Sequence, residues 1–305
     1  MASTASPVLL LRPVNEPIRL WRGTRRDLRD VWDHRELLKA FASRELRARY
    51  KGAAFGMAWA LVRPLVMLLI YGVAVGIFLG AGRSIPQFMV FIYSGLLGWT
   101  LFSTLVMGCI TSVTSNAALL TRASFPRLLL PLAVLLAALV DFLLQASVLL
   151  VGYAVFGDLP SPADLLWLPP SLAVLILFGL GVGLALAAVN VYARDIAFLA
   201  DVGLQVGFWA APIIYSYGQV VRGSQEFGLA SDLITRIYML NPMANVAIGF
   251  QRALWPAGSS EAAAQFAFPG QLALRLGIFL IVSLLVAWTG MRIFVKLSAN
   301  FGQEL

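Results

Sequence analysis

A series of long apolar runs is the feature that most constrains the fold of this chain. Six such runs follow one another, at roughly 59–79, 88–113, 128–156, 167–189, 197–217 and 271–294. A helix needs about 20 apolar residues to cross a bilayer, and it satisfies its own backbone hydrogen bonds there. Because 60% of the residues are hydrophobic and only 12% are charged, the composition excludes a soluble domain. We therefore expect an all-α polytopic membrane protein with six transmembrane helices.

The basic residues are distributed unevenly, and this asymmetry predicts the orientation in the membrane. Residues 1–58 carry 12 Lys and Arg against 6 Asp and Glu, whereas the remainder has few charges. An even number of spans places both termini on one side, and Lys and Arg accumulate on the cytoplasmic side of membrane proteins. We expect a multi-pass protein of the plasma (inner) membrane with both termini in the cytoplasm. The formal charge of +8 follows from this topology and does not indicate nucleic-acid binding.

The chain divides into a cytoplasmic arm, 1–58, and a transmembrane domain, 59–305. In the arm, Asp33 as N-cap and Glu36 at the third helical position predict a helix over about 34–51. Its moderate amphipathy and many basic residues are typical of an interfacial helix that lies on the cytoplasmic leaflet and contacts membrane lipids. An ordinary charged flank that only sets the topology is the alternative.

The connection 115–127 joins the second and third apolar runs and lies in water. It can form one short helix that begins at Ser115 or Asn116 as N-cap and ends before Pro126, whose ring disfavours a helical residue before it. We interpret this element as a helix that docks into a cytoplasmic motor subunit. A plain loop is the simpler interpretation.

The segment 218–270, between the fifth and sixth runs, is unusually long. It contains two apolar stretches, 232–240 and 243–255, which Asn241 and Pro242 separate. Neither stretch reaches spanning length, so we expect two short re-entrant helices that enter the outer leaflet and are covered by protein. They would gate an exit from the membrane, or serve only as interfacial anchors.

Glycines recur at intervals of four in three of the runs, including Gly179 and Gly183 on the fourth. Gly72, Gly76 and Gly80 lie on the first, and Gly203 and Gly207 lie on the fifth. Small residues at this spacing let two helices approach closely. They indicate either packing within the chain or a homodimer interface, formed by the first and fifth spans around a conduit.

One acidic side chain lies deep within a run, and several aromatic side chains also occur in the runs. Asp141 is central in the third run, where an ionised group costs about 2.5–3.5 kcal/mol, so we expect it to have a structural hydrogen bond. Aromatic belts at the two membrane surfaces, or stacking against sugar rings in a conduit, would explain the rings. The candidate conduit aromatics are Tyr71, Trp99, Phe102, Phe208, Trp209 and Tyr215.

The sequence offers no motif for catalysis. One cysteine and one histidine argue against a clustered metal site, and we expect no cofactor bound by this chain. It contains no G-x-x-x-x-G-K-[ST], no H-E-x-x-H and no G-x-S-x-G. We therefore predict no catalytic or metal-binding residues, and a transport subunit that is not itself an enzyme.

The order of several short motifs resembles one family, the membrane (permease) subunits of ABC exporters for lipid-linked polysaccharides such as O-antigen and teichoic acid. The residues that carry the likeness are 46–52 with Trp59 and Pro64, 116–131, Val140-Asp141-Phe142, Arg194-Asp195-Ile196 and Asn241-Pro242-Met243. The resemblance implies a homodimer of six-span subunits with two copies of a separate ABC ATPase subunit, which would hold the ATP and Mg. It also implies an interface helix, a coupling helix at about 115–127 and gate helices within 218–270.

The resemblance assigns roles to two groups of residues. Those that would contact the ATPase are Asn116, Leu119, Leu120, Arg122, Phe125 and Arg127. Those that would surround the anionic polyprenyl-pyrophosphate headgroup of the glycan substrate are Arg44, Arg47, Arg49, Lys51 and Arg63. The polymer would then leave the cytoplasm for the outer face of the membrane.

Three other functions remain open. An ion-driven secondary transporter would show several buried ionisable groups and internal repeats. A membrane-embedded glycosyl- or phospho-transferase would need a larger cytoplasmic loop to hold its catalytic residues. An ABC exporter of a drug or a small lipid would share the motifs above.

Overall fold

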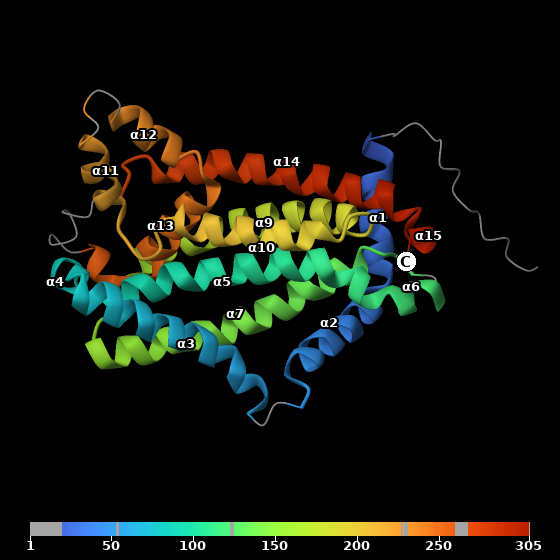
Figure 1. The fold of residues 1–305 in the computed structure, drawn as a ribbon, viewed down its shortest axis with the longest axis horizontal. Helices are drawn as coiled ribbons and strands as arrows, with labels where there is room; N and C mark the ends of the chain where they lie inside the picture. The colour runs from blue at the N-terminus through green and yellow to red at the C-terminus, as the bar shows by residue number, and fades with distance from the viewer. Residues whose placement is uncertain are drawn as a thin grey trace, which may run out of the picture.

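The structure is a computed structural model that describes residues 20–52, 55–122, 125–226, 228, 231–259 and 268–304. Every regular element in these ranges is a helix, and the long helices lie side by side along one axis (Figure 1). Five are long and apolar enough to cross a membrane: Gly56–Phe78, Phe88–Ser112, Leu129–Val155, Pro162–Asn190 and Leu272–Ser298. The prediction of an all-α polytopic membrane protein is therefore confirmed.

The fifth predicted span ends earlier than expected. Helix α10, Asp195–Trp209, has 15 residues, which span about 22 Å and fall short of the ~30 Å hydrocarbon core. Pro212 follows closely, and proline disfavours a helical residue before it and supplies no N–H. Two side chains bind the carbonyls left free: Asn241 Nδ2 donates to Ala210 O at 3.0 Å and Gln251 Nε2 to Pro212 O at 2.6 Å. A count of six spans stays a prediction.

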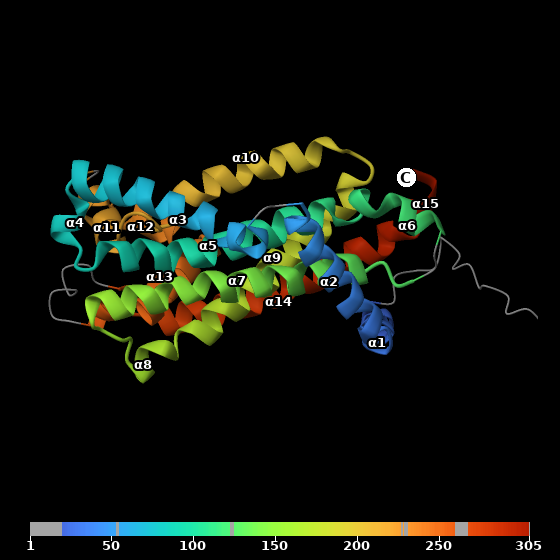
Figure 2. The same cartoon turned by 90° about the horizontal axis from the view of Figure 1, so that it is seen from below.

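Helix α5, Phe88–Ser112, is the centre of the bundle, because most of its length is buried. It packs against α7, Leu129–Phe156, and α9, Leu168–Asn190. On one side of this core lie α10 and α3, Trp59–Tyr71, which continues as a wider π-helix, Gly72–Phe78 (Figure 2). Both helices leave much of their surface exposed, and α10 has no buried residue.

Three short helices close one end of the bundle. They are α11, Tyr217–Gln225, α12, Ser231–Tyr238, and α13, Pro242–Leu254. The 13 residues of α13 reach about 20 Å, too short to span a membrane, and nearly all of them are buried. Helices α12 and α13 lie where two short helices were expected, whereas α11 was not predicted. Their gating role stays a prediction.

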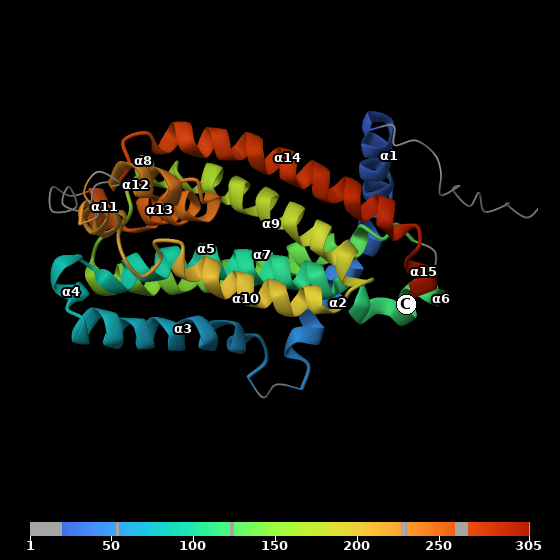
Figure 3. The same cartoon turned by 45° about the horizontal axis from the view of Figure 1, so that its top comes forward.

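The two ends of the described chain lie together at the opposite end of the bundle. Figure 1 places α1, Leu20–Asp33, α6, Ala117–Arg122, and α15, Phe301–Glu304, there, and α4, Ala81–Ser84, with α11 and α12 at the other. Helix α1 runs across the long helices, and α2, Arg35–Tyr50, descends from it toward them (Figure 3).

One local prediction in the arm is wrong. Asp33 does not cap α2, because it is the last residue of α1 and its backbone is already helical. His34 occupies the cap position instead and makes no capping hydrogen bond from its side chain. Its ring Nδ1 lies 2.7 Å from Asp30 O, so it closes the end of the preceding helix.

The glycines expected at helix contacts mostly face this chain itself. A methyl group added at Gly72 or Gly76 would overlap Met89 or Phe88 of α5, and one at Gly207 would lie 2.9 Å from the Trp99 ring. Gly80 has a positive φ of 73° and forms a turn. These positions support packing within the chain, whereas Gly203 faces open space.

Helices α9 and α14, Leu272–Ser298, approach closely at Gly290, where an added methyl group would overlap the backbone of Gly181 on α9. We predict that Gly290→Ala forces the two helices apart and costs about 1–3 kcal/mol of stability. The thermal midpoint in detergent should therefore fall by several degrees. Gly277→Ala on the same helix is the control, because nothing lies within 4 Å of it. Equal midpoints for both variants would contradict this packing.

Candidate coupling and substrate-binding site

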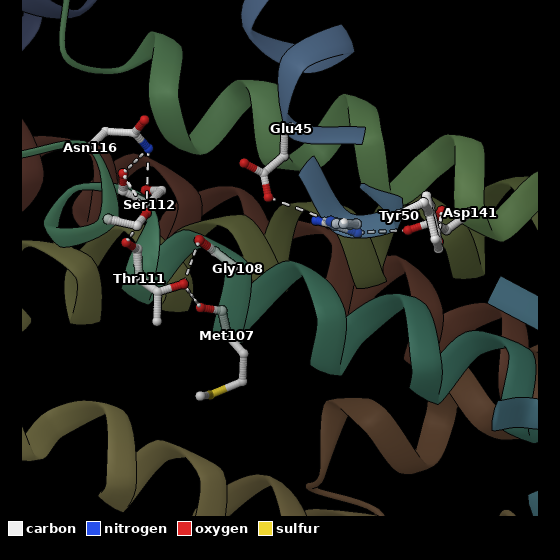
Figure 4. Close-up of polar contacts among 10 residues, drawn as sticks. Glu45, Tyr50, Met107, Gly108, Thr111, Ser112, Asn116 and Asp141 are labelled. Carbon is white, nitrogen blue, oxygen red and sulfur yellow. Dashed lines mark hydrogen bonds and ion pairs between the residues drawn. The ribbon is translucent and has the colours of Figure 1, made fainter. Parts of the chain in front are cut away.

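A buried ion pair joins the arm to the bundle. Arg49 Nη1 lies 2.6 Å from Asp141 Oδ2, and the Tyr50 hydroxyl donates to Asp141 Oδ1 at 2.7 Å (Figure 4). Arg49 Nε also lies 3.5 Å from Glu45 Oε1. Both carboxylate oxygens therefore have donors, and the guanidinium lies between two acids. Asp141 is about 18 Å along α7 from Leu129, so the end of α2 reaches well beside the bundle.

The pairing follows from the cost of burying charge. The Asp141 side chain is only 8% exposed, and an ionised carboxylate at such a position needs a partner and hydrogen bonds. Burial, and then the hydrogen bond to Asp141, raise the pKa of Tyr50, so its hydroxyl stays a donor. The structural hydrogen bond predicted for Asp141 is thus present. Its partners come from the arm, so Arg49 does not lie free among the headgroups.

The connection after α5 contacts the same arm. A 3-10 turn, Thr114–Asn116, leads into α6, so the expected single helix is two short ones and ends at Arg122. Asn116 Oδ1 accepts a hydrogen bond from the Arg44 guanidinium. The Phe125 ring packs edge-on against Phe41, with centroids 5.2 Å apart. These two contacts therefore fix the position of helix α2 relative to the connection.

The predicted N-caps of the connection act differently. Ser115 Oγ donates to Thr111 O at 2.8 Å, and Asn116 Nδ2 donates to Ser112 O at 2.8 Å. Both side chains therefore satisfy free carbonyls at the end of α5. They extend α5 into the connection, because the backbone from Val113 to Ala117 remains helical.

The other predicted coupling residues also contact this chain. Leu119 is half-buried, and Leu120 packs against a cluster that includes Val113 and Leu128. The Arg127 guanidinium lies over the Phe301 ring, 5.7 Å from its centroid. The Arg122 side chain lies outside the described residues. The structure thus places most of this set against the bundle.

A second ion pair joins the two ends of the chain. Asp27 Oδ2 of α1 lies 3.5 Å from Arg292 Nη1 of α14, and both side chains are less than one fifth exposed. This pair was not predicted, because 265 positions separate its members and no spacing in the sequence reveals it. Helix α1, which carries Asp27, was not predicted either, because the expected arm helix covered only about 34–51.

The five predicted headgroup residues fall into two groups. Arg44 and Arg49 are engaged with Asn116 and Asp141. Arg47, Lys51 and Arg63 are exposed, and Arg47 makes only a hydrogen bond to the carbonyl of Ser43 in its own helix. Only the second group has cationic heads available for an anionic ligand.

The six candidate conduit aromatics form one continuous set. Tyr71 stacks on Phe208 at 5.7 Å, which joins α3 to α10, and Trp99 of α5 contacts both Phe208 and Phe102. Phe208 also contacts Trp209, whose carbonyl accepts a hydrogen bond from the Tyr215 hydroxyl at 2.6 Å. Beside them is a largely apolar cavity of about 270 Å³ between α5, α9 and α10. Its use as a conduit stays a prediction.

Comparison with known families identifies the chain's relatives. A family model described as "ABC-2 type transporter" matches residues 36–249, which is more than two thirds of the chain. The chain belongs to the ABC-2 type transporter family. The matched region of this ABC-2 transporter begins in α2 and ends in α13, so it contains both ion-pair partners Arg49 and Asp141. Helix α1 lies before it.

Curated relatives of this ABC-2 transporter share most of its length. It is 30% identical over 224 residues to the O-antigen export system permease protein RfbA of Myxococcus xanthus, covering 73% of this chain and 82% of that protein. A Klebsiella pneumoniae protein of the same description is 26% identical over 221 residues, covering 71% and 79%. Within the described ranges, no group of three or more His, Cys, Asp or Glu is arranged to hold a metal ion.

We predict that Arg49→Met destabilises the ABC-2 transporter by about 3 kcal/mol, because it leaves the Asp141 carboxylate buried without its cation. The double variant Arg49→Met, Asp141→Leu should recover much of this loss, since it removes both charges. Unfolding in detergent measures both. Arg47→Met, two residues away and exposed, is the control and should change little. A double variant as unstable as the sum of the single ones would contradict the pairing.

Proposed function

We propose that this chain is the transmembrane subunit of an ATP-driven exporter that moves a polyprenyl-pyrophosphate-linked polysaccharide to the outer face of the plasma membrane. The observation that carries the proposal is the 30% identity to an O-antigen export permease over 82% of that protein. O-antigen is therefore the first candidate, and teichoic acid or a related envelope glycan is of the same chemical class. Both termini would be cytoplasmic, as the basic arm suggests.

In this proposal the energy comes from two copies of a separate ABC ATPase, which hold ATP and Mg. The sequence has no nucleotide-binding motif of its own. The ATPase would push on α6 and the adjoining residues. Because Asn116 bonds to Arg44 and Phe125 packs on Phe41, this push would reach α2. The pair between Arg49 and Asp141 would then pass it to α7.

A homodimer would enclose the conduit between the α3 and α10 faces of two subunits. Helix α3 with its π-helical continuation and helix α10 lie on one side of the bundle and expose large apolar side chains, among them Leu69, Ile77, Phe198 and Val206. The ring set from Tyr71 to Tyr215 lies on this side, and aromatic faces suit a sliding sugar chain. Gly203 is the one glycine of the predicted interface set on α10 that has open space around it.

The function is tested by deleting the gene and examining the cell envelope. We expect loss of a surface polysaccharide and accumulation of its lipid-linked form inside the cell, and purification from native membranes should bring down an ABC ATPase. A complementing copy of the gene should restore the surface glycan. Normal surface glycan with increased sensitivity to drugs would instead favour a drug or small-lipid exporter.

The three exposed cations predict where the headgroup binds. Replacing Arg47, Lys51 and Arg63 by glutamine should lower glycolipid-stimulated ATPase activity of the assembled exporter by about tenfold, because charge-assisted bonds to pyrophosphate are lost. Assembly with the ATPase should be unchanged. Arg83→Gln, an exposed cation at the opposite end of the bundle, is the control. Unchanged stimulation in the triple variant would contradict this site.

A further inference from the structure

A polar pocket lies at the end of the bundle opposite the arm. It has a volume of about 310 Å³ and opens between α11, α12 and the first turn of α14. Its lining includes Tyr217, Ser224, Asp232, Thr235, Arg236 and Arg275. The pocket is far larger than one water molecule requires. It differs from the cavity beside α10, whose walls are largely apolar.

Two guanidinium groups and one carboxylate line this pocket, so its formal charge is positive. Within the described residues, Arg236 and Arg275 have no ion pair at 4 Å or less. Among the residues that the structure describes, Arg275 Nε is buried and has no hydrogen-bond partner. A buried donor without a protein partner calls for another explanation, such as a bound ion or solvent. Two unpaired cations around it favour an anion.

The pocket also has hydroxyl donors held in place. Ser224 Oγ on α11 and Thr235 Oγ1 on α12 lie 3.0 Å apart, and Ser224 also bonds to the carbonyl of Val221 at 2.7 Å. These bonds fix the two helices that form its walls. Arginines and hydroxyls are the donors that phosphate oxygens prefer.

An apolar stripe begins beside the pocket. On α14 the exposed side chains Leu274, Ile278, Ile281 and Leu285 recur at helical spacing, and Leu274 adjoins Arg275. Each is at least half exposed. A ligand with a charged head in the pocket could therefore lay a hydrocarbon chain along α14. A free sugar or ion has no hydrocarbon chain that could pack against such a stripe.

We propose that this pocket binds the phosphate group of a lipid in the outer leaflet, with Arg236 and Arg275 as its ligands. The assignment to the outer leaflet rests on the proposed function and its orientation. The lipid has two possible sources of the same chemistry: the polyprenyl pyrophosphate that carries the glycan, or an anionic phospholipid of the membrane. Asp232 opposes the anion and limits the affinity.

The test uses the chain assembled with its ATPase in nanodiscs of phosphatidylcholine that contain either a polyprenyl monophosphate or phosphatidylglycerol. Native mass spectrometry measures how much of each probe lipid stays bound. Arg236→Gln with Arg275→Gln should lower retention of at least one probe by about tenfold. Asp232→Asn should raise it, because the opposing charge is removed. Arg222→Gln, exposed on α11 and not part of the lining, should leave it unchanged.

Each outcome decides the proposal. Selective loss of the polyprenyl probe supports a carrier site, and selective loss of phosphatidylglycerol supports a phospholipid site. The proposal is overturned if the double variant retains both probes as well as the unaltered chain does. It is also overturned if Arg222→Gln loses as much probe as the double variant. A raised retention in Asp232→Asn supports the charge dependence of the site, independently of any loss in the double variant. The proposed function fails separately, if the unaltered chain binds no ATPase and exports no glycan.

Discussion

The arrangement of the arm depends above all on one interaction, the pair between Arg49 and Asp141. A carboxylate within an apolar bundle must be compensated, and here a guanidinium and the Tyr50 hydroxyl occupy its two oxygens. This fixes how far α2 descends along α7. The pair also determines which α2 side chains contact the connection after α5, because Phe41 and Arg44 lie on the turns of α2 that precede Arg49. An arm that would otherwise be a charged flank becomes part of the bundle.

At the opposite end of the bundle, buried backbone polar groups must likewise be compensated. Where α10 stops at Trp209, the chain continues without regular structure among buried residues. Such backbone is tolerated at depth only where protein covers it. The buried α13 supplies this cover, and Asn241 and Gln251 bind the carbonyls that have no partner within a helix. The short α10 and the short α13 therefore depend on each other.

Local signals predicted much of this fold. The run 88–113 matches α5, Phe88–Ser112, nearly to the residue, because apolarity and length alone define such a helix. Features that need long-range contacts were not predictable. A buried Asp141 predicted a partner, but that partner, Arg49, is 92 positions away in the arm. The cap expected at Asp33 is absent because Asp33 belongs to helix α1. The glycine spacing could not separate contacts within the chain from contacts between chains.

In the proposed mechanism, a separate ATPase drives this subunit through an arm that a buried ion pair holds to the bundle. The most direct measurement reconstitutes the chain in liposomes, with and without the ATPase, and follows a labelled lipid-linked glycan across the membrane. The account predicts transport only with both proteins and ATP, and its loss when Arg49 and Asp141 are both replaced by apolar residues in a complex that still assembles. Transport by the chain alone under an ion gradient would contradict it.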